Sequence, residues 1–254
     1  MIVRRSALKG DEIILEIGSG LFALTIPLSL SARKVIAIEK DKDLIEIVRE
    51  VYGVDSPDSQ FPNVTIIEAG ILDVDISEIA ESEKSPLTVF GNLPYNISSQ
   101  ILVKLIENKN HISRAILMFQ KELAERITEG PGSKGYGRLS VMLGYCSDIK
   151  VLADINANQF YPKPKVDSVV IEIVFKNKPE YQVNDENFFF KVIKAAFGQR
   201  RKTLRNALSG SELMLSPADA EIALAKSSID PKRRAETLEI SEFIKLTDSL
   251  SATL

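Results

Sequence analysis

Short apolar runs of strand length alternate with helical stretches through the first two thirds of this chain. The apolar runs are residues 12–17, 34–39, 64–67, 87–90 and 115–119. The clearest helical stretches are residues 43–51, 98–107 and 121–128. Strands that alternate with helices are typical of a mainly parallel sheet whose two faces are covered by helices. We therefore predict an α/β fold for this part of the chain.

The pattern changes in the last third of the chain. Residues 166–175 are rich in β-branched side chains, and with residues 150–155 we expect them to form an antiparallel edge of the sheet. Residues 176–179 form a polar, proline-containing break, beyond which the pattern is helical only, at residues 186–197, 201–208, 217–226 and 241–250. We predict a first domain over residues 1–178 and a small all-helical domain over residues 179–254.

The composition excludes several classes of protein. The 254 residues include one cysteine and one histidine, which leaves no pair for a disulfide and no cluster for zinc, so we expect no metal site. The apolar runs are too short for a membrane span, and residues 1–5 do not lead into a secretory signal. We therefore expect a cytoplasmic protein without membrane association.

Charge is distributed unevenly along the chain. The net charge is −3, which does not by itself indicate a nucleic-acid partner. Residues 196–206 nevertheless contain no acid and have the cations Arg200, Arg201, Lys202 and Arg205. A local group of this kind can contact phosphates while the rest of the surface remains acidic.

The first strand ends in a turn suited to a nucleoside. Gly18-Ser19-Gly20 follows the run at residues 12–17, and glycines at such a place let a ligand approach the backbone beside an electropositive helix start. Glu39 ends the second run, where an acid that binds a ribose is expected. Ala23 stands where a dinucleotide-binding motif has its third glycine, so the spacing favours a single nucleoside.

A second polar segment follows the strand at residues 87–90. It reads Gly91-Asn92-Leu93-Pro94-Tyr95-Asn96-Ile97. The Asn92 side-chain oxygen can accept a hydrogen bond from an amino group, and Pro94 restricts Leu93 to an extended conformation that can direct its carbonyl outward. Tyr95 supplies a ring on which a base can stack. These are the parts needed to hold an exocyclic amine and its ring.

Four collinear segments resemble S-adenosylmethionine-dependent methyltransferases with a Rossmann-like sheet, and more narrowly the ribosomal RNA adenine N6,N6-dimethyltransferase family. They are Glu16-Ile17-Gly18-Ser19-Gly20-Leu21, Asn92-Leu93-Pro94-Tyr95, residues 160–168 (Phe-Tyr-Pro-Lys-Pro-Lys-Val-Asp-Ser) and residues 196–206. Together they extend over nearly the whole chain.

The resemblance implies the roles of individual residues. It implies a target adenine between Tyr95 and Phe160, an N6 amino group held by the Asn92 side chain and the Leu93 carbonyl, and catalysis by positioning and electrostatics. It implies that Gly18 packs against the methionine part of S-adenosylmethionine and that Glu39 accepts from its ribose. The predicted catalytic set is Asn92, Leu93, Pro94, Tyr95 and Phe160, and the predicted cofactor set is Glu16, Gly18, Gly20, Glu39, Gly70, Ile71 and Asn92.

The resemblance also implies the partner. We expect an enzyme that dimethylates adjacent adenines in a small-subunit rRNA hairpin during ribosome biogenesis and acts as a monomer on the immature small subunit. Arg200, Arg201, Lys202 and Arg205 are the predicted RNA contacts. Two alternatives remain open, a non-catalytic rRNA-binding assembly factor and a 23S rRNA adenine N6-methyltransferase. Residues 135–138 are compatible with either an RNA-facing loop or a glycine-rich turn.

Two departures from the family pattern affect the cofactor site. An N-terminal segment with a Gln-Asn-Phe-Leu motif, which covers the cofactor in family members, is expected to be missing, so the site should be more open to water. Gly70 stands where the family usually has an Asp that accepts from the cofactor's adenine amino group. A lost hydrogen bond of this kind costs about 0.5–1.5 kcal/mol, so we expect weaker cofactor binding than in the family generally.

Overall fold

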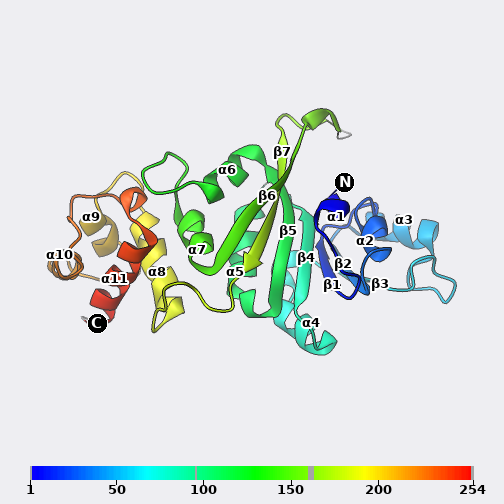
Figure 1. Ribbon diagram of the computed structural model, residues 1–254, viewed down its shortest axis with the longest axis horizontal. Coiled ribbons are helices and arrows are strands. Elements are labelled where there is room, and N and C mark those ends of the chain that lie inside the picture. The colour runs from blue at the N-terminus through cyan, green and yellow to red at the C-terminus, as the bar shows by residue number, and fades with distance from the viewer. Residues whose placement is uncertain (1, 95, 160–162, 253–254) are drawn as a thin grey trace. The chain divides into compact units, whose positions relative to one another are not determined.

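The computed structural model describes residues 2–94, 96–159 and 163–252, and these residues include a seven-stranded sheet (Figure 1). The strands are β1 (Ile13–Ile17), β2 (Lys34–Glu39), β3 (Val64–Glu68), β4 (Leu87–Asn92), β5 (Ile112–Gln120), β6 (Ser147–Ile155) and β7 (Ser168–Phe175). Their order in the sheet is β3-β2-β1-β4-β5-β7-β6. The first five strands are parallel and β7 is antiparallel to β5. The predicted α/β fold, with an antiparallel strand added after the parallel set, is confirmed.

The chain divides into two compact units, and each is described by itself. The sheet unit contains residues 1–124 and 148–175. Its helices are α1 (Ile2–Arg5), α2 (Thr25–Ser29), α3 (Lys42–Tyr52), α4 (Ile76–Glu83), α5 (Ser98–Glu107) and the start of α6 (Lys121–Thr128), with the short 3-10 turns η1 (Ile71–Asp73), η2 (Lys109–His111) and η3 (Ala157–Gln159). None of the helices that the structure describes is both long and apolar enough to cross a bilayer.

The helical unit contains residues 125–147 and 176–254. Its elements, after the end of α6, are α7 (Arg138–Cys146), α8 (Glu186–Phe197), α9 (Leu204–Ser209), α10 (Pro217–Lys226), η4 (Ala235–Thr237) and α11 (Ile240–Ser251). The sequence placed the division after residue 178, whereas the contacts divide the chain after Phe175 and also assign residues 125–147 to the helices. The reason is that α7 packs against α8 and α11.

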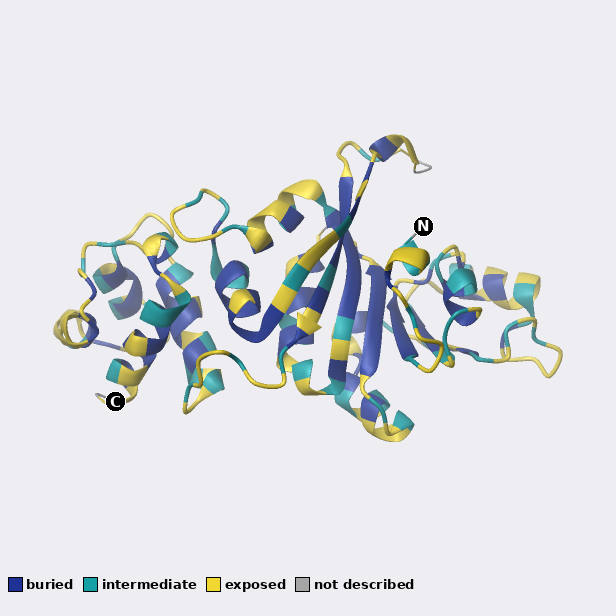
Figure 2. Ribbon diagram, in the orientation of Figure 1, coloured by how far each residue is buried: buried dark blue, intermediate teal, exposed yellow. Residues whose placement is uncertain are grey.

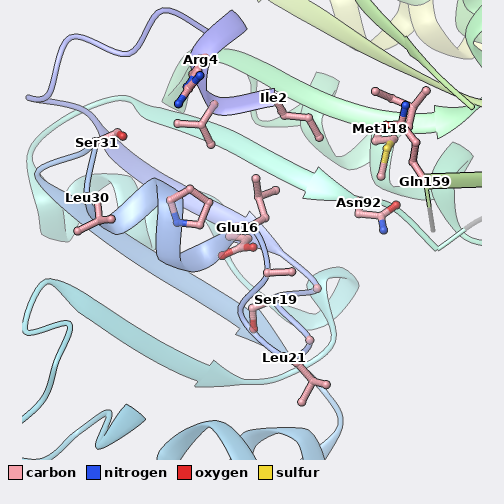
Figure 3. Close-up of a pocket in the computed structure, with 17 residues that line it drawn as sticks. Ile2, Arg4, Glu16, Ser19, Leu21, Leu30, Ser31, Asn92, Met118 and Gln159 are labelled. Carbon is pink, nitrogen blue, oxygen red and sulfur yellow. The ribbon is translucent and has the colours of Figure 1, made fainter. Parts of the chain in front are cut away.

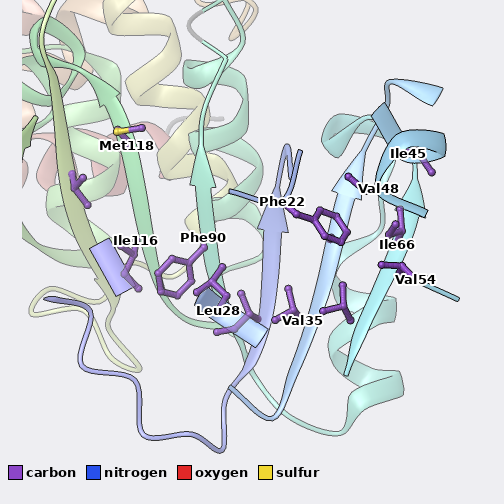
Figure 4. Packing of buried hydrophobic residues seen from close by; sticks show 14 of the residues in the cluster. Phe22, Leu28, Val35, Ile45, Val48, Val54, Ile66, Phe90, Ile116 and Met118 are labelled. Carbon is purple, nitrogen blue, oxygen red and sulfur yellow. The ribbon is translucent and has the colours of Figure 1, made fainter. Parts of the chain in front are cut away.

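Burial explains why the strands occupy these positions. All five residues of β1 are buried, as are the first five of β4 (Figure 2). Strands that are apolar on both faces are stable only between two layers of helices. Around them Phe22, Leu28, Phe90 and Ile116 belong to one continuous core (Figure 4).

The strand order reverses direction between β1 and β4, because the chain moves outward from β1 through β2 to β3 and then returns to the other side of β1. In open α/β sheets, ligands bind in the crevice beyond the carboxyl ends of the strands at such a switch point. The residues that follow β1 and β4 are therefore the first candidates for a site.

β1 and β4 approach each other closely where they end. Ile17 pairs with Gly91, one residue before Asn92. A Cβ atom added to Gly91 would lie 2.9 Å from Leu93 Cδ2, 3.1 Å from the Ile17 carbonyl oxygen and 3.2 Å from Ile17 Cβ. A side chain at position 91 would force the two strands apart.

Candidate functional site

A cavity of about 810 Å³ lies beyond the carboxyl ends of β1 and β4 (Figure 3). It brings together Glu16, Gly18, Gly20 and Asn92, which come from two of the predicted sets. The other described residues that line it are Ile2, Val3, Arg4, Ser19, Leu21, Ala23, Leu24, Pro27, Leu30, Ser31, Met118, Ile155 and Gln159. The lining is therefore mostly apolar, with a few polar groups at the strand ends, as expected of a small-molecule site.

The turn after β1 presents bare backbone to the cavity. Gly18 and Gly20 have φ angles of 72° and 52°, in the left-handed region that favours glycine. A Cβ atom at either position would meet nothing within 4 Å, so both face open space. The Gly18 amide donates to the Ile38 carbonyl at 2.9 Å, which fixes the turn to β2. A ligand can approach this backbone closely without displacing any side chain.

Glu39 is oriented by that same turn. Its carboxylate accepts from the Gly20 amide at 2.9 Å through Oε2, and from the Lys40 and Asp41 amides at 2.9 and 3.0 Å through Oε1. A carboxylate has about four acceptor positions, so one remains for a ligand hydroxyl. Glu39 is not among the described residues that line the cavity, but it adjoins the turn that does.

Glu16 is the most unusual charged group of the site. Its side chain is 1% exposed, and its Oε2 atom has no hydrogen-bond partner among the described residues. Burial raises the pKa of the Glu16 carboxyl to about 7; the Thr25 hydroxyl opposes this rise and the negative charge of Glu39 adds to it. Ser19 is also buried beside it, with an Oγ that lacks a partner in the described part of the chain. Buried polar atoms without partners inside a cavity indicate a place for a polar, preferably cationic, ligand group.

Asn92 is the last residue of β4 and is exposed at the cavity. It pairs with Met118 on β5, and the next amide, that of Leu93, donates to the Met118 carbonyl at 3.2 Å. The Pro94 carbonyl accepts from Ser98 Oγ at 2.7 Å, which anchors the segment to the start of α5. The backbone on both sides of Asn92 is therefore held, whereas the side-chain amide of Asn92 has no hydrogen-bond partner within the described ranges.

Two predicted catalytic residues, Tyr95 and Phe160, lie outside the described residues. The predicted cofactor residues Gly70 and Ile71 lie at the start of η1, after β3. They are near Glu39, because the Ala69 amide donates to the Glu39 carbonyl at 2.9 Å. The ideal Cβ position of Gly70 is 2.9 Å from Asp73 Oδ2. The Asp73 carboxylate therefore occupies the space next to Gly70 that an aspartate at position 70 would use.

The four predicted RNA contacts differ in whether their side chains already bind other protein groups. Arg200 donates to the Lys134 carbonyl and lies 3.6 Å from a Glu236 carboxylate oxygen, and Arg205 pairs with Glu221 at 3.0 Å. Arg201 and Lys202 are exposed, and their side chains have no partner in the described part of the helical unit. These two cations are the most available for phosphate.

Several residues of the cavity and of the basic surface have no signal in the sequence. Met118, Ile155 and Gln159 line the cavity, and only the pairing of strands distant in sequence shows this. In the helical unit, the Leu204 amide donates to the Arg233 carbonyl at 2.8 Å. This bond brings the exposed Lys232 and Arg234 near the start of α9. The described residues contain no group of three or more His, Cys, Asp or Glu side chains that could hold a metal ion.

The loop at residues 129–137 is fixed in place. The Tyr136 hydroxyl, which is buried, donates to the Leu238 carbonyl at 3.0 Å. The Gly135 amide donates to Glu129 Oε2 at 2.6 Å, and the Gly132 amide donates to the Glu236 carbonyl at 2.8 Å. This loop is a turn anchored within the helical unit.

Comparisons with known proteins agree along almost the entire chain. A family model described as ribosomal RNA adenine dimethylase matches residues 1–251. A protein of Desulforapulum autotrophicum named ribosomal RNA small subunit methyltransferase A is 48% identical over 250 residues, which cover 98% of this chain and 86% of the relative. A protein of the same name from Clostridium acetobutylicum is 41% identical, covering 98% of this chain and 87% of its own.

Solved structures show the same fold. A dimethyladenosine transferase from Plasmodium falciparum superposes with a TM-score of 0.75 at 24% identity, covering 99% of this chain and 94% of that one. The 23S rRNA methyltransferase ErmE superposes with a TM-score of 0.68 at 22% identity, covering 98% and 95%. At these identities the two structures support the fold alone.

Proposed function

Because this chain belongs to the ribosomal RNA adenine dimethylase family, we infer that it is an S-adenosylmethionine-dependent methyltransferase that dimethylates N6 of adenines in small-subunit rRNA. One observation supports placing this activity in the cavity described above. Asn92 and the Gly18–Gly20 turn stand at the ends of neighbouring strands and line the same cavity. The curated relatives bear the small-subunit name, so the 23S rRNA alternative and the non-catalytic alternative are not favoured.

The residues of the cavity fit the cofactor. The open backbone of Gly18 and Gly20 admits a nucleoside, and the unpartnered Glu16 carboxyl suits a group with positive charge. When bound, S-adenosylmethionine supplies an activated methyl group. We propose that Glu16, Gly18, Gly20 and Glu39 hold it, with Gly70 and Ile71 at the adenine end.

Asn92 and Leu93 supply the positioning that the reaction needs. Adenine N6 is a weak nucleophile because its lone pair is delocalised into the ring. The Asn92 side-chain oxygen and the Leu93 carbonyl oxygen accept hydrogen bonds from the two N–H groups of this amino group. These two hydrogen bonds localise the lone pair on the nitrogen and orient it. The backbone that carries both groups is held by β4, β5 and α5 before substrate arrives, which limits the reorganisation that the reaction needs. The rings of Tyr95 and Phe160 are proposed to stack on the two faces of the base.

The test of this function is to map the product. Small subunits that lack adenine dimethylation are incubated with the chain and S-adenosylmethionine, and their rRNA is analysed by mass spectrometry. Dimethyladenine in small-subunit rRNA is the expected result. Methylation in 23S rRNA, or RNA binding without methylation, would contradict it.

Three finer points belong to the same proposal. We propose that the chain acts as a monomer, in the cytoplasm, on the immature small ribosomal subunit. Two general considerations support the last point: a base must leave its stack to be methylated, and rRNA helices are more accessible before assembly is complete. The single cysteine, Cys146, is buried, so the fold requires no oxidising compartment.

Gly70→Asp is expected to tighten cofactor binding two- to tenfold, which corresponds to the added hydrogen bond of about 0.5–1.5 kcal/mol. The new carboxylate must displace the Asp73 side chain, which now lies 2.9 Å from the Cβ position. Calorimetric titration with S-adenosylmethionine measures the change. Gly70→Ala is the matched control, because it adds the same Cβ without an acceptor. Unchanged or weaker binding in Gly70→Asp would refute the role of this position.

Charge reversal at Arg201 and Lys202 is expected to weaken RNA binding and to lower the slope of log affinity against log salt by about 2, since each lost phosphate contact removes about one unit. Binding of an rRNA fragment is measured between low and high salt by fluorescence anisotropy. The double variant Lys178→Glu/Lys226→Glu, at two exposed lysines of the helical unit, has the same change in net charge and is the control. An unaltered slope in the double variant would exclude these residues as phosphate contacts.

A further inference from the structure

One amide side chain at the methyl-transfer end of the cavity has no role in the proposed reaction. Gln159 lines the cavity together with Asn92 and Met118. In Figure 3 it is drawn at the Asn92 end, and Leu30 and Ser31 are at the opposite end. Its side chain is exposed to the cavity and has no hydrogen-bond partner among the residues that the structure describes. An amide in this position can both donate and accept.

The turn that carries Gln159 is held firmly at its base. Gln159 ends η3, and its own amide donates to the Asn156 carbonyl at 3.0 Å. The buried Ala157 donates its amide to Asp167 Oδ1 at 2.8 Å. The Asp167 carbonyl in turn accepts from the Lys121 amide at 3.0 Å. Asp167 thus connects η3 to the residue that follows β5.

This connection continues to Asn92 through the sheet. Met118 of β5 pairs with Asn92 on one side and with Val170 of β7 on the other. Gln120 pairs with Ser168, the residue next to Asp167. The Asn92 and Gln159 backbones are therefore linked by consecutive hydrogen-bonded elements of one compact unit, which fixes the relative position of the two backbone positions from which the amide side chains extend.

The chemistry of the two amides is complementary to one edge of adenine. The adenine amino group is a donor, and the ring nitrogens N1 and N7 near it are acceptors. Asn92 and Leu93 use their oxygens for the amino group, so the ring nitrogens need a separate donor. A single asparagine or glutamine amide can pair with both N6 and N7 of adenine; here the amino group and the ring nitrogen would be divided between two residues.

We propose that the Gln159 side-chain amide donates a hydrogen bond to a ring nitrogen of the target adenine, N1 or N7, and thereby contributes to base selection. This inference rests on the proposed function of the same cavity. Asp167 is then a positioning residue, which acts through the Ala157 amide and η3. Guanine presents an N–H group at N1, so a donor placed for adenine N1 is mismatched to guanine, whereas N7 is an acceptor in both purines and a contact there selects a purine over a pyrimidine.

The experiment measures kcat/KM for methylation of small-subunit rRNA by Gln159→Leu, which keeps approximate size and removes both polar atoms. We expect about a tenfold loss, the effect of one hydrogen bond to a base within the site. Asn158→Leu is the matched control on the same turn, since Asn158 is exposed and is not among the described residues that line the cavity. It should retain the wild-type value.

Modified substrates identify the atom. The target adenines are replaced by 1-deazaadenosine or by 7-deazaadenosine, which lack N1 and N7 respectively. We expect one of these two analogues to lower kcat/KM of the wild-type protein by about the same factor as Gln159→Leu does. In the Gln159→Leu variant that analogue should cause no further loss of kcat/KM. Wild-type activity in Gln159→Leu, or an analogue effect equally large in the variant, would overturn the inference alone. Absence of methylation by the wild-type chain would overturn the proposed function as well.

Asp167 has its own test. Asp167→Ala should lower kcat/KM as Gln159→Leu does, and the double variant should show no additional loss, because both changes remove the same contact. Asp167→Asn keeps an oxygen for the Ala157 amide and should restore most of the activity. Additive losses, or no rescue by asparagine, would show that Asp167 does not act through Gln159.

Discussion

Asn92→Ala is expected to lower kcat for methyl transfer by about 10²–10³-fold, the usual cost of removing one preorganised hydrogen-bonding group from a reacting centre. The alanine variant loses the oxygen that we propose accepts from the adenine amino group, and of the two proposed acceptors only the Leu93 carbonyl remains. The fold should not change, because Asn92 is exposed and its side chain has no partner among the described residues. Cofactor affinity should change much less than kcat, since the lost contact is to the acceptor base.

Transfer of a tritiated methyl group from S-adenosylmethionine to immature small subunits measures the effect. Asn177→Ala is a suitable control, because Asn177 is an exposed asparagine in the other unit. Single-turnover rates separate the methyl-transfer step from product release. A variant that methylates within a few-fold of the wild-type rate would show that Asn92 is not the principal amine acceptor.

The second large effect concerns Glu16 and the pH dependence of cofactor binding. S-adenosylmethionine carries positive charge, so it should bind preferentially to the form in which Glu16 is ionised. Because burial raises the Glu16 pKa to about 7, the ionised fraction of the free protein rises from about one tenth at pH 6 to about nine tenths at pH 8. We expect affinity to increase about tenfold across this interval.

Glu16→Gln should abolish this rise and bind the cofactor more weakly than the wild type at pH 8. Calorimetric titrations at pH 6, 7 and 8 provide the comparison. The amino group of the cofactor also titrates, and the glutamine variant measures that contribution separately. If the variant shows the same increase in affinity as the wild type, the titrating group is not Glu16.

The same pKa predicts an opposite effect on the free protein. Below about pH 4.5 the Glu16 carboxyl is protonated in both the folded and the unfolded states. Between pH 4.5 and about 7 the unfolded chain releases this proton and the folded chain retains it. The free energy of unfolding therefore falls as pH rises through this window, and the loss is nearly complete by about pH 8. Without cofactor, Glu16→Gln should be more stable than the wild type at pH 8, by on the order of 2–3 kcal/mol, and its melting temperature should be higher.

The sequence could predict the parts of the site that depend on local pattern. The strand, Gly18-Ser19-Gly20 turn and Glu39 were predicted because glycines and acids at strand ends have recognisable positions, and in the structure Glu39 accepts from the Gly20 amide. The parallel order of strands then brings Asn92 to the same cavity. The family resemblance is the source of the proposal for what these residues act on.

Other features depend on contacts between distant segments and have no local signal. The pattern of residues 12–17 does not show that Glu16 is almost completely buried without a partner for Oε2. The basic run gives no indication that Arg200 and Arg205 are engaged by Glu236 and Glu221. The assignment of α7 to the helical unit follows from its packing against α8 and α11, which no periodicity within residues 138–146 reveals.

Gly91 has a consequence for attempts to redesign this enzyme. Because its missing side chain lets β4 lie directly against Ile17 of β1, the distance between the cofactor turn and Asn92 is set by the contact of two backbones. Libraries that seek a new acceptor base should therefore leave residues 16–20 and 91–93 intact and diversify Gln159 and its neighbours on η3. Such libraries keep the proposed cofactor-binding turn and the proposed amine acceptors in place.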